Sequence, residues 1–229
     1  MIFSSWLFKA LTLSDKFKKG KLLAYRLLCV MTIRQHDIEL PNDHLAQFYR
    51  VLHHGLVSLD QDVVNVLVKY CGPRFLAMPM QGSTMLILDF IHAANTIAAV
   101  SDLKEFPRTE AVSILGALLC FPNHLGELTV LEPNQGELSL MLCNDAKDHL
   151  IGVLLKLGKK EPAGLARCIA VSSLGMYLYE ELKHGTMHSR IKEAIHMLLL
   201  TLRIIDRAVA QVACDMLVLL DEWCLNLLQ

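Results

Sequence analysis

Charged and aromatic side chains are both scarce in this sequence of 229 residues. Charged residues make up 20% and aromatic residues 7%, whereas 53% of the residues are hydrophobic. An ordinary soluble domain carries about 25% charged residues. The apolar residues are mainly Leu, Ala, Val, Ile and Met, which suit helices packed on more than one side better than strands. The formal net charge of −1 leaves no basic footprint for a nucleic-acid backbone, so nucleic acid is excluded as a partner.

Cysteine pairs and metal-binding spacings are also missing. The seven cysteines are scattered, their number is odd, and no C-x-x-C occurs. This usage is typical of free thiols in a reducing compartment, so we expect a cytoplasmic protein without disulfides or a structural metal. His53 and His54 are adjacent, with His44 nearby, but adjacent helical residues point about 100° apart. We therefore predict no metal ligands and no cofactor.

The sequence contains no run that would span a membrane. Its longest apolar stretch, Met85 to Val100, includes Asp89, His92 and Asn95, which are too polar for a spanning helix. The stretch from Met1 to Leu13 is apolar, but the lysines at positions 16, 18, 19 and 21 follow it, whereas a secretory signal has its positive charges before the apolar residues. The run from Asp15 to Lys21 could grip an anionic membrane surface, but four lysines with one aspartate favour a solvated turn, so we expect no membrane binding.

Motifs of the common catalytic classes are absent. The sequence has no G-x-S-x-G, H-E-x-x-H, G-x-G-x-x-G or phosphate-binding loop. The one pair of interest is Asp89 and His92, which share a helix face inside an apolar run. Such a pair could be catalytic if it lined a closed pocket, but more often it forms an interhelix hydrogen bond or a polar contact with a partner.

Helical periodicity recurs along most of the chain. The apolar spacing and the capping residues predict helices near 42–56, 61–71, 82–100, 107–121, 144–157, 162–184, 186–203 and 206–228. Between them, 122–143 is irregular. Leu128–Leu131 and Leu138–Leu142 could form a hairpin around Pro133, but two isolated strands are marginal in water, so we expect a long loop.

Two helices begin alike, with an acidic residue and then an Ala-rich apolar helix. They start at Glu161 and Asp206, 45 positions apart. Repeats of the HEAT and armadillo type have periods of about 40–47 residues. The sequence therefore predicts an all-α, HEAT/armadillo-like α-solenoid of stacked antiparallel helix pairs. We expect one repeat segment over 1–229, with a first half at 20–121, the irregular loop at 122–143 and a second half at 144–229.

A series of short matches resembles the alpha subunit of the Ral GTPase-activating protein, the tuberin-related large subunit. The matching stretches are His44–Leu56, Asp60–Asn65, Gly72–Phe75, Met85–Ile91, Phe121–Asn123, Ala166–Cys168, Ser173–Gly175, Ile191–Ala194 and Val209–Leu217. They are packing and surface residues of a helical-repeat region, and the similarity runs from about Gly20 to Leu217.

The resemblance implies a role in regulating small GTPases. In that family the activity lies in a C-terminal GTPase-activating domain that uses an asparagine, and nothing in this chain resembles that domain. It therefore implies a non-catalytic scaffold segment that positions the partner beta subunit or another protein surface, with no catalytic residue to carry over. Two alternatives stay open: a free-standing HEAT or armadillo adaptor unrelated to Ral, and a helical enzyme built around Asp89 and His92.

The two ends of the array are rich in apolar side chains. A repeat array buries each unit on the next, so an uncovered end exposes apolar surface. We expect at least one end to bind a protein partner, the remainder of a longer chain or a second copy. The candidate partner-binding residues are Trp6 and Phe8 near the N-terminus and Leu217, Leu220 and Trp223 in the last helix.

Overall fold

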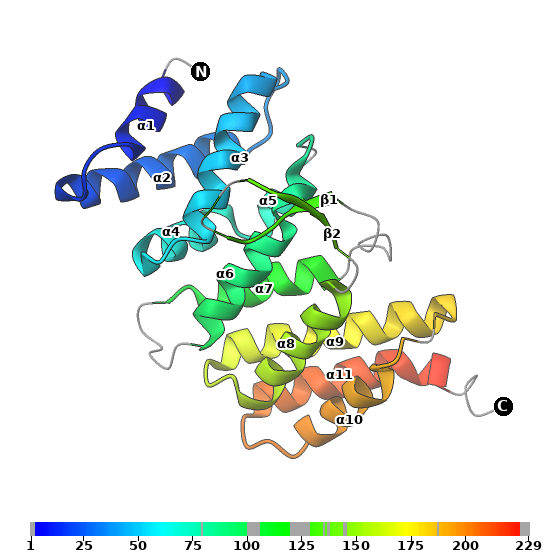
Figure 1. Ribbon diagram of the computed structural model, residues 1–229. Helices are drawn as coiled ribbons and strands as arrows, with labels where there is room; N and C mark the ends of the chain where they lie inside the picture. Colours follow the sequence, from blue (N-terminus) through cyan, green and yellow to red (C-terminus); the bar gives the residue numbers. More distant parts are fainter. Residues whose placement is uncertain are drawn as a thin grey trace.

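The computed structural model describes most of the chain, and most of the described part is helical (Figure 1). It covers residues 3–78, 80–99, 106–119, 129–134, 136, 138–143, 146–186 and 188–224. Of residues 222–224 only the backbone is described. The helices are α1 (Ser4–Leu11), α2 (Lys18–Thr32), α3 (Asn42–Leu56), α4 (Gln61–Cys71), α5 (Arg74–Ala77), α6 (Ile87–Ala99), α7 (Arg108–Leu119), α8 (Ala146–Lys160), α9 (Gly164–His184), α10 (Ile191–Thr201) and α11 (Arg207–Cys224). The predicted all-α class is confirmed.

Short polar side chains and glycines set several helix ends. Before α4, the Asp60 carboxylate accepts the amide of Asp62 at 3.0 Å, and after it Gly72 has a φ of 54°. Before α11, the Asp206 carboxylate accepts the amide of Ala208 at 3.0 Å. These contacts satisfy first-turn amides that have no partner inside the helix. They explain why the starts of α4 and α11 could be predicted within a residue.

From α6 onward the helices pack pairwise, α6 with α7, α8 with α9, and α10 with α11. The second members of the pairs also pack on one another, α7 on α9 and α9 on α11. In Figure 1, α9 (yellow) and α11 (red) lie side by side and run in the same direction. One cluster of buried apolar residues extends through this arrangement from Leu28 in α2 to Leu220 in α11.

Glycines allow α7, α9 and α11 to pack closely on one another. A Cβ atom placed on Gly116 of α7 would lie 2.2 Å from Oγ of Ser173 in α9. One placed on Gly175 of α9 would lie 2.4 Å from Cγ of Met216 in α11. Real Cβ atoms do not come so close to other heavy atoms, so a larger residue at either site would push the two helices apart.

The loop predicted over 122–143 is wrong in part, because the described residues of this segment form a hairpin. Strand β1 (Thr129–Leu131) pairs antiparallel with β2 (Leu140–Leu142), and Val130 faces Met141. The prediction treated the two strands as isolated. Instead β1 packs on α6 and on the 3₁₀ turn η2 (Ser83–Leu86), which leaves Val130 1% exposed. Residues 122–128 lie outside the described residues.

The helix predicted over 82–100 starts later than expected. Gly82 has a φ of 79°, residues Ser83–Leu86 form η2, and α6 begins only at Ile87. Across the described residues, no helix has the length and apolarity needed to cross a bilayer.

Candidate protein-interaction surface

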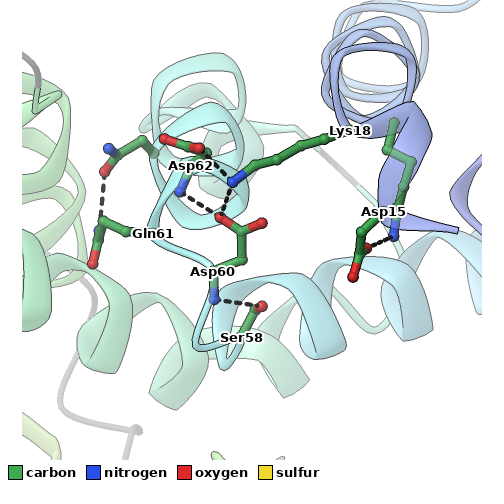
Figure 2. Close-up of polar contacts among 8 residues, drawn as sticks. Asp15, Lys18, Ser58, Asp60, Gln61 and Asp62 are labelled. Atoms are coloured by element: carbon green, nitrogen blue, oxygen red, sulfur yellow. Dashed lines mark hydrogen bonds and ion pairs between the residues drawn. The ribbon is translucent and has the colours of Figure 1, made fainter.

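A cluster of ion pairs joins the start of α2 to the start of α4. Lys18 opens α2, and its Nζ lies 3.0 Å from the Asp60 carboxylate and 2.6 Å from that of Asp62 (Figure 2). Lys21, one turn along α2, pairs with Asp15 of the preceding 3₁₀ turn η1 (Asp15–Phe17) at 3.0 Å. The solvated turn predicted over 15–21 is therefore wrong for Lys18 to Lys21, which form the first turn of a packed helix.

The carboxylates and the ammonium group of this cluster shift one another's pKa. Hydrogen bonds to Asp62 and Asp60 raise the pKa of Lys18. Burial alone would raise the pKa of Asp60, but its hydrogen bonds with Lys18 and with the Asp62 amide lower it. Lys18 is thus held charged, and its positive charge is balanced by the two aspartates.

This cluster forms one side of a large open groove of about 1060 Å³, which we call the α2–α4–α7 groove. Its first wall comes from η1 and the start of α2, with Lys16, Phe17, Lys18 and Lys19. Its second wall is one face of α4, with Asp62, Asn65, Val66, Lys69 and Tyr70. These positions follow the i, i+3, i+4, i+7, i+8 spacing of a single helix face. Phe106, Pro107 and Glu110, at the start of α7, close the third side.

The groove combines apolar surface with positive charge. Phe17 is 56% exposed, and Tyr70 is half-buried beneath the guanidinium of Arg26, 4.8 Å from the ring centre. Lys16, Lys19 and Lys69 are exposed, and none of them forms an ion pair with the described residues. Aromatic anchors are typical of surfaces that bind proteins, and charges beside them favour partners of opposite charge.

Asp89 and His92 do not line a common site, and Asp89 makes the interhelix hydrogen bond that the sequence favoured over a catalytic role. His92 is exposed on α6, whereas Asp89 is 0% exposed and faces α3, where its Oδ2 lies 2.8 Å from Nδ1 of the equally buried His53. Residues three positions apart on a helix differ in direction by only about 60°, but here Asp89 lies on the buried side of α6 and His92 on the exposed side. Burial raises the pKa of Asp89 to about 6. A sealed pair without a pocket offers no place for a substrate.

A second buried ion pair is structural. Nε and Nη2 of Arg108 donate to the two carboxylate oxygens of Glu161, at 2.7 and 2.8 Å. The same guanidinium donates to the carbonyl groups of Ile97 and Ala98, at 3.2 and 3.0 Å, and Glu161 accepts the amide of Ala163 at 3.1 Å. The network ties the end of α6, the start of α7 and the α8–α9 turn together. No cluster in the described part of the chain has three side chains placed to hold a metal ion.

The residues predicted to bind partners lie in different surroundings. Trp6 is 67% exposed, with its ring edge-on to Phe3, whereas Phe8 is half-buried and its ring lies 5.5 Å from that of His44. Leu217 is half-buried beside a hollow of about 300 Å³ next to Val218, which is 68% exposed. Leu220 is 1% exposed and belongs to the core. The side chain of Trp223 lies outside the described residues. A role for these residues in partner binding stays a prediction.

The chain is similar in sequence to known proteins over almost its whole length. It is 43% identical over 222 residues to the mouse Ral GTPase-activating protein subunit alpha-1, and 46% identical over 225 residues to the mouse subunit alpha-2. Both matches cover 97% of this chain. The chain is homologous to one region of the Ral GTPase-activating protein alpha subunits.

The homologous region is a small part of those subunits. The chain spans only 11% of the length of mouse alpha-1 and 12% of mouse alpha-2. A Drosophila protein named probable Rho GTPase-activating protein CG5521 is 34% identical over 251 residues, covering 96% of this chain and 13% of its own length. No family model matches the chain, and no solved structure matches it.

Proposed function

We propose that the chain is a non-catalytic helical-repeat scaffold of a Ral GTPase-activating complex, working in the cytoplasm. In this proposal residues 1–229 form one α-solenoid segment of the HEAT or armadillo type, which binds the beta subunit or another protein. The observation that carries the proposal is the identity of 43–46% to the alpha subunits over 97% of this chain.

The packing of the helices supports the solenoid. Successive pairs α6–α7, α8–α9 and α10–α11 repeat the same neighbour relationships, and α7, α9 and α11 pack in series. Glu161 and Asp206 mark equivalent points in this series, because each lies just before the second helix of its pair and accepts an amide two residues further on. Stacking of units that cannot bury their apolar faces alone is the defining feature of a solenoid.

The surroundings of the buried charges favour a scaffold over an enzyme. The pairs His53–Asp89 and Arg108–Glu161 are sealed in the core, where they join helices. Stimulation of GTP hydrolysis needs a group that reaches the nucleotide and stabilises the charge of the transition state. Neither pair is placed to do so.

Binding to the beta subunit tests the proposal. The purified chain would be mixed with recombinant beta subunit and passed over a size-exclusion column with mass detection. We expect a peak whose mass equals the sum of the two proteins. Separate elution of the two, at concentrations of about tens of micromolar where weak interfaces already associate, would contradict binding to this subunit. An alpha-subunit segment from outside the homologous region serves as the control.

A further inference from the structure

The α2–α4–α7 groove has a charge imbalance that the whole chain lacks. The full sequence has a formal net charge of −1, whereas the described residues that line the groove include four lysines and two acidic residues. Asp62 is already paired with Lys18. Among the described lining residues, the charges of Lys16, Lys19 and Lys69 are therefore offset by one remaining acidic side chain, that of Glu110.

The groove also has apolar lining residues. Phe17 follows Lys16 directly in the chain, and Val66 and Tyr70 lie on the same face of α4 as Lys69. From Asp62 to Tyr70 this face is about 12 Å long, at a rise of about 1.5 Å per residue. That length matches about two turns of a helix laid along it. An amphipathic segment binds such a groove with apolar residues one turn apart.

The walls of the groove are held in place before any partner binds. Lys18 ties α2 to the start of α4 through both aspartates (Figure 2). Towards the other ends of the two helices, the sulfur atoms of the buried Cys29 and Cys71 lie 3.5 Å apart. A preformed groove reduces the entropy cost of binding.

We propose that the α2–α4–α7 groove binds an acidic, amphipathic segment of a protein partner. Carboxylates of the segment would pair with Lys16, Lys19 and Lys69, while its apolar residues would pack on Phe17, Val66 and Tyr70. The inference rests on the proposed partner-binding function and adds the place and the chemistry of the contact. The recessed shape and the carboxylate of Glu110 favour a peptide segment over the flat anionic surface of a membrane.

A random library of displayed 16-residue peptides tests the groove without assuming a sequence. Clones would be selected on the wild-type chain and depleted on a K16E/K19E/K69E variant. Synthetic peptides from the remaining clones would then be measured by fluorescence anisotropy. We expect them to carry an excess of Asp and Glu together with aromatic or aliphatic residues. We also expect the triple variant to weaken their binding at least tenfold, and higher salt to weaken it further.

Three controls make the result specific. A K156E/K159E/K160E variant makes the same charge change at exposed positions of α8 and should alter binding less than twofold. A Phe17→Ser variant keeps every lysine and should weaken the same peptides at least threefold. Circular dichroism and thermal unfolding of all variants should match the wild type, because the replaced side chains are exposed.

Several outcomes would overturn the inference. It fails if no clone discriminates the triple variant, or if the discriminating peptides lack an acidic excess. It also fails if the library yields no binder while the chain sediments with vesicles containing 30% phosphatidylserine and the triple variant does not. The groove would then bind a membrane surface. A wild-type chain and a triple variant that both bind the beta subunit, without discriminating clones, would refute the groove and leave the proposed function standing.

Discussion

Arg108 and Glu161, 53 positions apart, form a bidentate ion pair that joins α7 to the α8–α9 turn. Arg108 is 5% exposed and Glu161 2%. Arg108→Met should lower the free energy of unfolding by about 3–5 kcal/mol, because the Glu161 charge would stay buried without its partner. Urea unfolding measures the change. Lys21→Met, which breaks the exposed pair with Asp15, is the matched control and should cost less than about 1 kcal/mol. Equal losses in both variants would contradict this account.

The buried pair of His53 and Asp89 should make stability depend on pH in a definite direction. The pKa of Asp89 is about 6 in the folded chain, against about 3.9 in the unfolded chain. The folded chain therefore favours the protonated Asp89 carboxyl, and this stabilisation is fully present below about pH 4. As the pH rises through about 6, the free energy of unfolding should fall by up to ~3 kcal/mol.

The comparison of the wild type with Asp89→Asn isolates this effect. The difference in unfolding free energy between the two proteins, from urea titrations between pH 3.5 and 6.5, should shift against the wild type as the pH rises. A difference that is flat, or that shifts in favour of the wild type, would contradict the raised pKa.

The exposed face of α11 should mediate self-association, whereas its buried face should not tolerate charge. Val218→Asp should reduce association in sedimentation velocity runs with little change in helicity, because Val218 is 68% exposed. Leu220→Asp should instead cost on the order of 3 kcal/mol or more, since it places a charge in the core. A wild-type chain that stays monomeric at about tens of micromolar would contradict association through this face.

The thiols should react in order of their exposure. Cys214 is exposed, whereas Cys29 and Cys71 are buried side by side. Burial and the hydrogen bond with Cys29 raise the pKa of Cys71 well above its usual value, which disfavours the reactive thiolate. Brief treatment with iodoacetamide, followed by mass spectrometry of the peptides, should label Cys214 before Cys29 and Cys71. Labelling of Cys71 in the folded chain at a similar rate would show that α2 and α4 separate readily.

The sequence predicted elements whose signals are local. The stripe from Leu45 to Leu56 and the cap at Asp60 place α3 and α4 almost where the structure has them. No helix was predicted over 18–32, because the four lysines and one aspartate of residues 15–21 suggested a solvated turn. The contact that stabilises this start comes from Asp60 and Asp62, 42 and 44 positions away. Spacing along one segment cannot show a contact of that kind.

The candidate surface was hidden from the sequence for a similar reason. Its three walls come from residues 16–22, 62–70 and 106–110, which only the packing of α2, α4 and α7 brings together. The sequence favoured an interhelix hydrogen bond for Asp89 but could not name its partner, His53, on another helix. The 45-residue spacing of Glu161 and Asp206 was visible, but the partner of Glu161, Arg108, was not.

The rate of GTP hydrolysis on Ral tests the central claim most directly, that this chain is a scaffold without catalytic groups. Single-turnover hydrolysis would be followed on Ral alone, with the purified chain, and with a full-length alpha subunit together with the beta subunit as the active control. Activating groups that reach the nucleotide accelerate hydrolysis by about 10³–10⁵-fold. We predict a rate with the chain equal to that of Ral alone, while the control accelerates it. An acceleration of more than about tenfold by the chain itself would contradict the account.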